Sequence, residues 1–260
     1  MMSKAKNSYL KLIMIMLVGA LIGGIIGGGG YYFFGREQKN IADFLSEMVW
    51  QIQNFILPIL IGITTISIIL GEYSLRKMNI IAEKISQSDD EECDIWEYEE
   101  EKMGAFGLNV NVLTQVLSIL VLSMGYSANY LEMIRGNINW FLYGCIVFLL
   151  CNVYNGVWQI RYVKLIQKIN PDKKGDPTSR KFQQQWLESC DEAEREVIYQ
   201  SSYKMYMTLA KILPLLLFIT MISNLLFNTG IFAIIVVALI WLISSVSYTH
   251  SCVTLKGKRL

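Results

Sequence analysis

The sequence has little charge for its length. Of 260 residues, 17% are charged and 53% are hydrophobic, which does not fit a soluble protein of this size and indicates a membrane protein. The net charge of +1 excludes a strongly basic nucleic-acid-binding protein, and we expect no direct nucleic-acid binding. Acidic residues are absent from the middle of every long apolar run, which argues against ion-coupled transport.

Several catalytic motifs are also missing. The chain has neither the G-x-x-x-x-G-K-[ST] loop of ATP hydrolysis nor the H-E-x-x-H helix of zinc proteases. His250, Cys252, Cys190 and Cys93 are an alternative zinc set, but a His-x-Cys spacing is not typical of zinc knuckles. We therefore predict that the protein is not an enzyme and needs no cofactor or metal.

Six apolar stretches are long enough to cross a membrane, which takes about 20 residues of helix. They run over Leu10–Phe34, Val49–Leu70, Leu108–Met124, Trp140–Trp158, Leu209–Phe227 and Ile231–Tyr248. The third stretch is the least apolar, since polar residues fill its first half. We still predict that it spans, because the segments after it would otherwise lie on the wrong side for their charges.

The basic residues are distributed very unevenly among the connecting segments. If the amino terminus is inside, 20 of the 23 Lys and Arg residues are inside, and only Arg36, Lys39 and Arg135 are outside. This asymmetry follows the positive-inside rule. It predicts a multi-pass protein of the cell membrane with both termini in the cytoplasm.

These segments give a fold class and a domain organisation. We predict an all-α polytopic membrane protein with six transmembrane helices in three hairpins and two helical cytoplasmic segments. Residues 1–70, 108–158 and 209–260 form the hairpins, the last with a basic tail. Residues 71–107 form an acidic cytoplasmic segment, and residues 159–208 form a second, helical one.

The two cytoplasmic segments carry opposite charge. The first has 11 acidic and 4 basic residues, and the second, counted to Lys211, has 10 basic and 7 acidic. One interpretation is that they dock on each other or that the acidic face binds a basic soluble partner. The other is that the acidic run is a solvated surface repelled by anionic lipid.

The second segment has clear helix-start signals. Asp176-Pro177 predicts an N-cap followed by proline at the first helical position, and Phe182 and Trp186 then share a helix face. Ser189 and Glu192 predict a capping box that opens the next helix. We propose Trp186, Asp191, Glu192 and Glu194 as a surface for a cytoplasmic partner.

Glycines follow a small-xxx-small pattern in the first apolar stretch. Gly19, Gly23 and Gly27 let two helix backbones approach closely in lipid. The pattern predicts helix packing, either in a homo-oligomer or, as we prefer, against another span of the same chain.

Amide side chains occur at depth in several of the spans. Gln115, Asn152, Asn155 and Asn224 could line a polar path or could bond between helices, which is their usual role.

The stretch from Gly175 to Glu194, with its Phe-Gln-Gln-Gln-Trp-Leu-Glu-Ser-Cys-Asp-Glu core, resembles an uncharacterised family of Gram-positive integral membrane proteins. The resemblance extends over most of the chain, including the turn Leu225-Leu-Phe-Asn-Thr-Gly. Members of that family are often encoded beside a small helix-turn-helix regulator. The resemblance therefore implies a membrane partner for a DNA-binding protein, and it carries over no catalytic residues.

Two functions follow from these observations. The first is a non-enzymatic membrane regulator or sensor that acts on a soluble partner through its cytoplasmic segments. The second is a permease-like or immunity subunit of a transport system. The short outer loops favour sensing within the lipid bilayer over capture of a large extracellular ligand.

Overall fold

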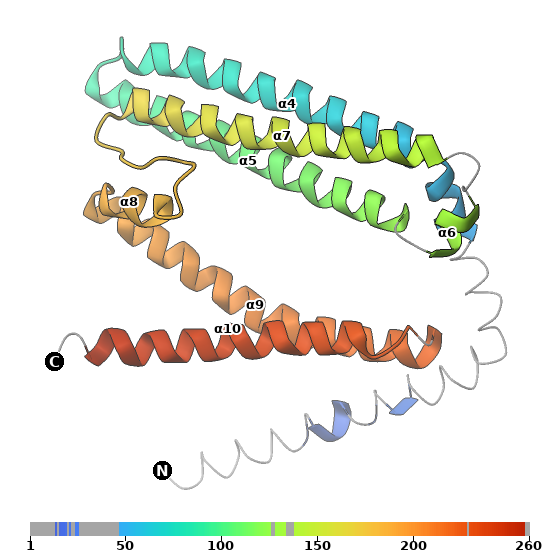
Figure 1. Cartoon of the computed structure of the whole chain (residues 1–260). Helices are drawn as coiled ribbons and strands as arrows, with labels where there is room; N and C mark the ends of the chain where they lie inside the picture. The colour runs from blue at the N-terminus through green and yellow to red at the C-terminus, as the bar shows by residue number, and fades with distance from the viewer. Residues whose placement is uncertain are drawn as a thin grey trace, which may run out of the picture. The chain divides into compact units, whose positions relative to one another are not determined.

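The structure is a computed structural model that describes residues 47–125, 128–133, 138–227 and 229–257, together with residues 14, 16–19, 21, 24 and 25 (Figure 1). The secondary structure of these residues is helical, without strands, and confirms the predicted all-α class. Most of the first predicted span, Leu10–Phe34, lies outside the described residues. Six spans and three hairpins therefore remain a prediction.

Five of the described helices are long and apolar enough to cross a membrane. They are α4 (Ile56–Ile85), α5 (Asp90–Gly125), α7 (Ile138–Ile169), α9 (Glu192–Phe227) and α10 (Phe232–Gly257). Two short helices, α6 (Ala128–Met133) and α8 (Phe182–Glu188), lie between them in the sequence. The five helices are compatible with a multi-pass membrane protein.

Helices α4, α5 and α7 each continue well beyond the predicted spans. Helix α4 runs on from Leu70 to Ile85, an extension of roughly 20 Å at 1.5 Å per residue. Helix α5 begins inside the acidic run, and α7 continues past Trp158 to Ile169. The end of the bundle at which α4 ends, α5 begins and α7 ends is called the charged end below.

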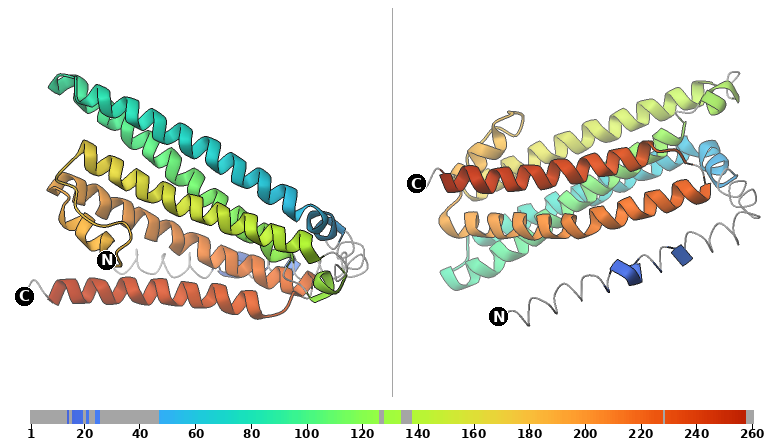
Figure 2. Two further views of the ribbon diagram at one scale, coloured as in Figure 1. Left: turned by 45° about the horizontal axis from the view of Figure 1, so that its top comes forward. Right: turned by 90° about the horizontal axis from the view of Figure 1, so that it is seen from below.

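Residues 47–195 form one compact unit, the bundle unit. Helices α4 and α5 are antiparallel and in contact along their length, and α7 packs against both (Figure 2). One core cluster, which includes Ile56, Leu60 and Phe141, lies away from the charged end. A second cluster, which includes Leu75, Met78 and Trp158, lies near the charged end.

The other unit contains α9 from Glu196 onward and α10. Their rings Tyr206 and Tyr248 stack with centroids 3.8 Å apart and planes 10° apart. The connecting turn has Gly230 at φ +84°, where glycine is favoured, and the Gly230 amide donates to Asn224 Oδ1 at 2.9 Å. Gly230 thus lies in the short connection between α9 and α10.

Candidate functional site

Polar side chains form a hydrogen-bonded cluster in the middle of the bundle unit. Asn155 of α7 is completely buried, and its Oδ1 accepts a hydrogen bond from Ser67 Oγ of α4 at 2.7 Å. Its Nδ2 lies 3.4 Å from Thr114 Oγ1 of α5, and Thr114 Oγ1 lies 3.2 Å from Ser67 Oγ. Asn111 Nδ2 donates to the Asn155 carbonyl at 3.0 Å. The cluster therefore links all three helices.

This cluster explains why the third predicted span is partly polar. Asn111, Thr114 and Ser118 recur at helical spacing on α5 and are all buried. Gln115 Nε2 donates to Asn111 Oδ1 at 3.2 Å. The sequence leaves two roles open for these amides, which are lining a polar path and bonding between helices. Asn155 and Gln115 bond within this cluster, because an unpaired amide in an apolar environment is costly.

One helical turn closer to the charged end, small residues make room for a tryptophan. Trp158 is 1% exposed and donates from Nε1 to the Gly71 carbonyl at 2.9 Å. A Cβ added at Gly107 would lie 2.7 Å from Trp158 Cη2, so only glycine fits there without a shift. Ser74 completes this niche, and its hydroxyl donates to the Met103 carbonyl at 2.9 Å.

An ion pair lies beside this tryptophan. Arg161 of α7 binds both carboxylate oxygens of Glu72 of α4, with Nη2 3.1 Å from Oε2. The Tyr154 hydroxyl donates to Glu72 Oε1 at 3.3 Å. The bidentate geometry fixes the register of α4 and α7 where the apolar part of each helix ends.

The acidic run at the start of α5 turns one face into the bundle. Glu100 is 8% exposed, and its Oε1 has no hydrogen-bond partner among the described residues. One turn further on, a Cβ added at Gly104 would lie 2.9 Å from the Tyr162 hydroxyl of α7. Lys84 of α4 lies 3.8 Å from the centroid of the Trp96 ring. The acidic segment thus contacts the first turns of the second predicted segment.

Residues 170–195, called the lobe below, connect α7 to α9 and include α8. Gln167 Nε2 donates to the Gly175 carbonyl at 2.7 Å, which holds the loop against the end of α7. Gly175 has φ +136°, and the Phe182 ring packs against it. At the other side of the loop, the Lys174 amide donates to Ser189 Oγ at 3.1 Å.

The charged side chain at the centre of the lobe is Lys173, which is only 9% exposed. Its ammonium forms an ion pair with Glu194 and lies 3.4 Å from Cys190 Sγ. Burial acts to lower the pKa of Lys173, but the hydrogen bonds to Glu194 and Cys190 outweigh it and hold this pKa above its ordinary value. The lysine therefore stays charged and joins the loop to the first turn of α9.

The predicted capping box is present but lies two residues later than expected. The Glu194 amide donates to Asp191 Oδ1 at 2.7 Å, and the Asp191 amide donates to Glu194 Oε2 at 3.0 Å. Ser189 and Glu192 do not form it, because the Ser189 hydroxyl donates instead to the Trp186 carbonyl at 2.7 Å and so serves the end of α8.

The predicted helix start at Asp176-Pro177 is wrong. Asp176 Oδ1 accepts from the amide and hydroxyl of Thr178 at 2.9 and 2.8 Å, and the Ser179 amide donates to the Asp176 carbonyl at 2.9 Å. The two hydrogen bonds from Thr178, first the one from its amide, hold the pKa of the Asp176 carboxyl below its ordinary value. They close a turn, and α8 begins only at Phe182.

The lobe encloses a surface hollow of about 740 Å³. Three carboxylates and one lysine are among its lining residues, so its charge is mainly negative. The lining residues are Asp172, Lys174, Gly175, Asp176, Gln185, Glu188 and Ser189.

The four predicted partner residues lie together in the lobe but have different environments. Asp191 and Glu192 are exposed, whereas Trp186 and Glu194 are half-buried. Trp186 packs on Phe182 with ring centroids 5.5 Å apart, which confirms that they share a helix face. Glu194 and Asp191 also have structural roles in the capping box, so Glu192 is the least constrained of the four.

The predicted glycine packing site cannot be placed in the fold. Gly19 has no atom within 4 Å of an added Cβ, and Gly23 and Gly27 lie outside the described residues. Helix packing through these glycines therefore stays a prediction.

Sequence reasoning missed two features of the bundle unit. The small residues Ser67, Gly71 and Ser74 follow one face of α4, and this spacing could have indicated a close helix contact. The buried Lys173 has no such signal, because it stands in a charged loop next to an exposed lysine.

These features are compatible with a multi-pass helical membrane protein that has a hydrogen-bonded polar cluster between three of its long apolar helices. The chain belongs to the family described as Protein of unknown function (DUF3169), whose model matches residues 6–251. No curated protein and no solved structure matches the chain.

Proposed function

We propose that this protein is a non-enzymatic membrane regulator whose lobe lies in the cytoplasm and binds a soluble partner. The observation that carries the proposal is the construction of the lobe. Side-chain bonds from Gln167 and Lys173 fix it to the end of α7 and the start of α9, and the Lys174 amide donates to Ser189 Oγ within it, while the hollow stays open. A preformed surface loses little conformational entropy on binding.

The charge of the hollow suggests the chemistry of the partner. Asp172, Asp176 and Glu188 outnumber Lys174, so a basic segment of a soluble protein fits best. A small helix-turn-helix regulator, the partner that the family resemblance implies, meets this requirement because DNA-binding proteins carry basic surfaces.

The alternative, a permease-like or immunity subunit, has weaker support. A transport path needs polar side chains that face water or substrate, yet Asn155 and Ser118 are fully buried and Ser67 is 2% exposed. Their bonding capacity is used in contacts between and within α4, α5 and α7. This arrangement favours a packed structural element over a passage.

Photo-crosslinking from the lobe tests the proposal in living cells. We would place a photoreactive amino acid at Gln185, which lines the hollow, and at Gln87, an exposed residue between α4 and α5. We expect one soluble protein to crosslink at Gln185 and not at Gln87, and Glu188→Lys to abolish its capture. Equal capture at both positions, or capture that survives Glu188→Lys and Asp172→Lys together, would contradict the proposal.

A further inference from the structure

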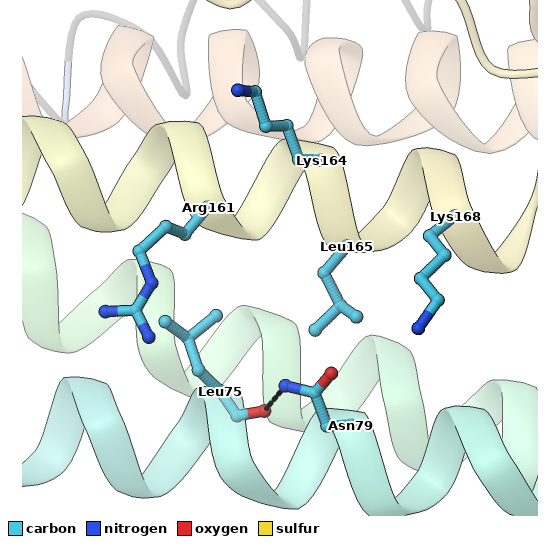
Figure 3. A pocket seen from close by; sticks show the side chains of 6 residues that line it. All are labelled: Leu75, Asn79, Arg161, Lys164, Leu165 and Lys168. Carbon is cyan, nitrogen blue, oxygen red and sulfur yellow. Dashed lines mark hydrogen bonds between the residues drawn. The ribbon is translucent and has the colours of Figure 1, made fainter.

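A second hollow, of about 300 Å³, lies between α4 and α7 near the charged end (Figure 3). It is called the α4–α7 groove below. Its size is at the lower limit of small-molecule sites in proteins. It is lined by Leu75, Asn79, Arg161, Lys164, Leu165 and Lys168.

The groove combines an apolar floor with a basic rim. Leu75 and Leu165 are 2% and 8% exposed. Arg161, Lys164 and Lys168 follow one another on α7 at intervals of three and four residues, so they lie along one side of that helix. The groove thus presents aliphatic carbon and positive charge side by side.

The side chains on the rim do not all point the same way. Arg161 and Lys168 extend toward α4, on either side of Leu165, and the Lys164 ammonium points away from α4 (Figure 3). Asn79 Nδ2 donates to the Leu75 carbonyl at 2.8 Å. Arg161 is paired with Glu72, whereas Lys168 has no acidic partner among the described residues. Of the two cations that extend toward α4, Lys168 is therefore the one that is free to bind an anion.

The depth of the groove matches the surface of a bilayer. Leu75 lies five residues after Leu70, the last residue of the predicted span Val49–Leu70, which is about 8 Å along the helix axis. The hydrocarbon core of a bilayer is about 30 Å thick. The predicted span Val49–Leu70 already crosses this thickness, so Leu75 lies just beyond the core. Asn79 and Lys168 then lie among the lipid headgroups.

We propose that the α4–α7 groove binds the headgroup of one anionic phospholipid from the leaflet at the charged end. Lys168 binds its phosphate, Arg161 and Lys164 extend the positive rim, and Leu75 and Leu165 contact the glycerol and the upper acyl chain. Basic pockets between transmembrane helices are suited to anionic headgroups, because the phosphate is neutralised and the apolar part stays out of water. This site is separate from the lobe hollow and does not depend on a soluble partner.

Lipid binding to the purified full-length protein tests the proposal. Native mass spectrometry in detergent would count the bound lipids while short-chain phosphatidylglycerol or phosphatidylcholine is added. We expect one phosphatidylglycerol to bind at least tenfold more tightly than phosphatidylcholine. Lys164→Gln with Lys168→Gln should weaken this binding about tenfold, because each lysine near a membrane contributes to the attraction of anionic lipid.

The matched control removes two exposed lysines elsewhere. Lys77 and Lys204 are exposed on α4 and α9 and do not line the groove. Lys77→Gln with Lys204→Gln changes the net charge equally and should leave phosphatidylglycerol binding within twofold. Lys168→Arg keeps the charge and should retain binding, and unchanged thermal unfolding in phosphatidylcholine would show that every variant folds.

Three results would overturn the proposal. The first is equal binding of the two lipids by the wild-type protein. The second is an equal loss of phosphatidylglycerol in both double variants, which would mean attraction by overall charge. The third is inorganic phosphate that displaces the lipid at millimolar concentration, which would identify the groove as a site for a soluble anion.

Discussion

Among the described residues, Trp158 has the largest fully buried side chain, and it fits because two neighbouring residues have no side chain. Gly71 and Gly107 approach it from α4 and α5, and neither position has room for a Cβ. The indole N–H would be unpaired in an apolar core, and the Gly71 carbonyl satisfies it. A flat, rigid ring between two glycines therefore determines how closely the three helices can approach.

Gly107→Ala should destabilise the bundle unit. The added methyl group would overlap the Trp158 ring, which cannot move aside easily, and overpacking of this kind costs about 1–3 kcal/mol. We expect a lower midpoint of thermal unfolding in a fixed detergent. Gly156→Ala is the matched control, because an added Cβ there meets nothing within 4 Å, and it should leave the midpoint unchanged or raise it. Equal effects of the two variants would contradict the steric account of Trp158.

Asn155→Leu tests the polar cluster at similar side-chain volume. Leucine would leave the Ser67 hydroxyl without the Asn155 Oδ1 acceptor that it now meets at 2.7 Å. Hydrogen bonds within membranes contribute about 0.6 kcal/mol each on average, and a buried unpaired group costs more, so we expect a loss of about 1–2 kcal/mol. Asn152→Leu is the control, since its Nδ2 bonds only to the Phe148 carbonyl of its own helix. An unfolding midpoint that is equal in the two variants would show that the cluster contributes little.

At the scale of the element, the lobe owes its order to one buried cation. Lys173→Met should loosen residues 170–190, because it removes the ion pair with Glu194 and the contact with Cys190. The expected cost is about 1–2 kcal/mol, since Glu194 is partly exposed and water replaces some of the lost interaction. Limited chymotrypsin digestion should cut faster at Phe182 and Trp186, while Lys174→Met, whose side chain is exposed, should not change the rate.

The raised pKa of Lys173 fixes how this effect depends on pH. A lysine with a raised folded-state pKa stabilises fully below its unfolded pKa of about 10.4, and the contribution is lost only as the pH rises through the higher folded value. The difference in digestion rate between the wild-type protein and Lys173→Met should therefore be the same at pH 7 and pH 9. A difference that disappears by pH 9 would mean that Lys173 titrates much lower and is not held by Glu194.

The helices of the bundle unit were predictable from the sequence, and the reason is length. Each apolar stretch is long enough that periodic polar residues such as Asn111, Thr114 and Ser118 do not interrupt it. Their ends were not predictable, because α4 and α5 continue into charged sequence where hydropathy gives no signal. Contacts between residues far apart in the sequence, such as Gly104 and Tyr162, support these extensions.

The lobe was harder to predict because local hydrogen bonds compete there. Asp176 has the residue type of an N-cap, but its carboxylate closes a turn with Thr178 and leaves the helix to begin later. Ser189 and Asp191 are both able to cap α9, and the choice depends on whether the Ser189 hydroxyl is needed at the end of α8. Sequence identifies such candidates, and the tertiary arrangement selects among them.

At the scale of the whole molecule, neutral polar groups and charged groups lie at different levels along the helices. In the middle of the bundle unit, polar side chains such as Asn155 are neutral and satisfy one another, and the Glu72–Arg161 pair comes only where the apolar parts of α4 and α7 end. Beyond that level, the acidic start of α5 lies beside the basic end of α7. This order along the helices is what a bilayer demands, because charge is costly in the hydrocarbon core and favourable among headgroups.

The distribution of basic residues predicts that the charged end and the carboxyl terminus lie in the cytoplasm. Single cysteines in a cysteine-free chain would test this with a membrane-impermeant maleimide on intact cells. Gln87→Cys, Thr178→Cys and the native Cys252 are exposed positions that should react only after the cells are permeabilised. Glu132→Cys, an exposed position in α6, should react from outside. Labelling of Gln87→Cys in intact cells would reverse the orientation, and it would place the lobe hollow out of reach of any cytosolic protein.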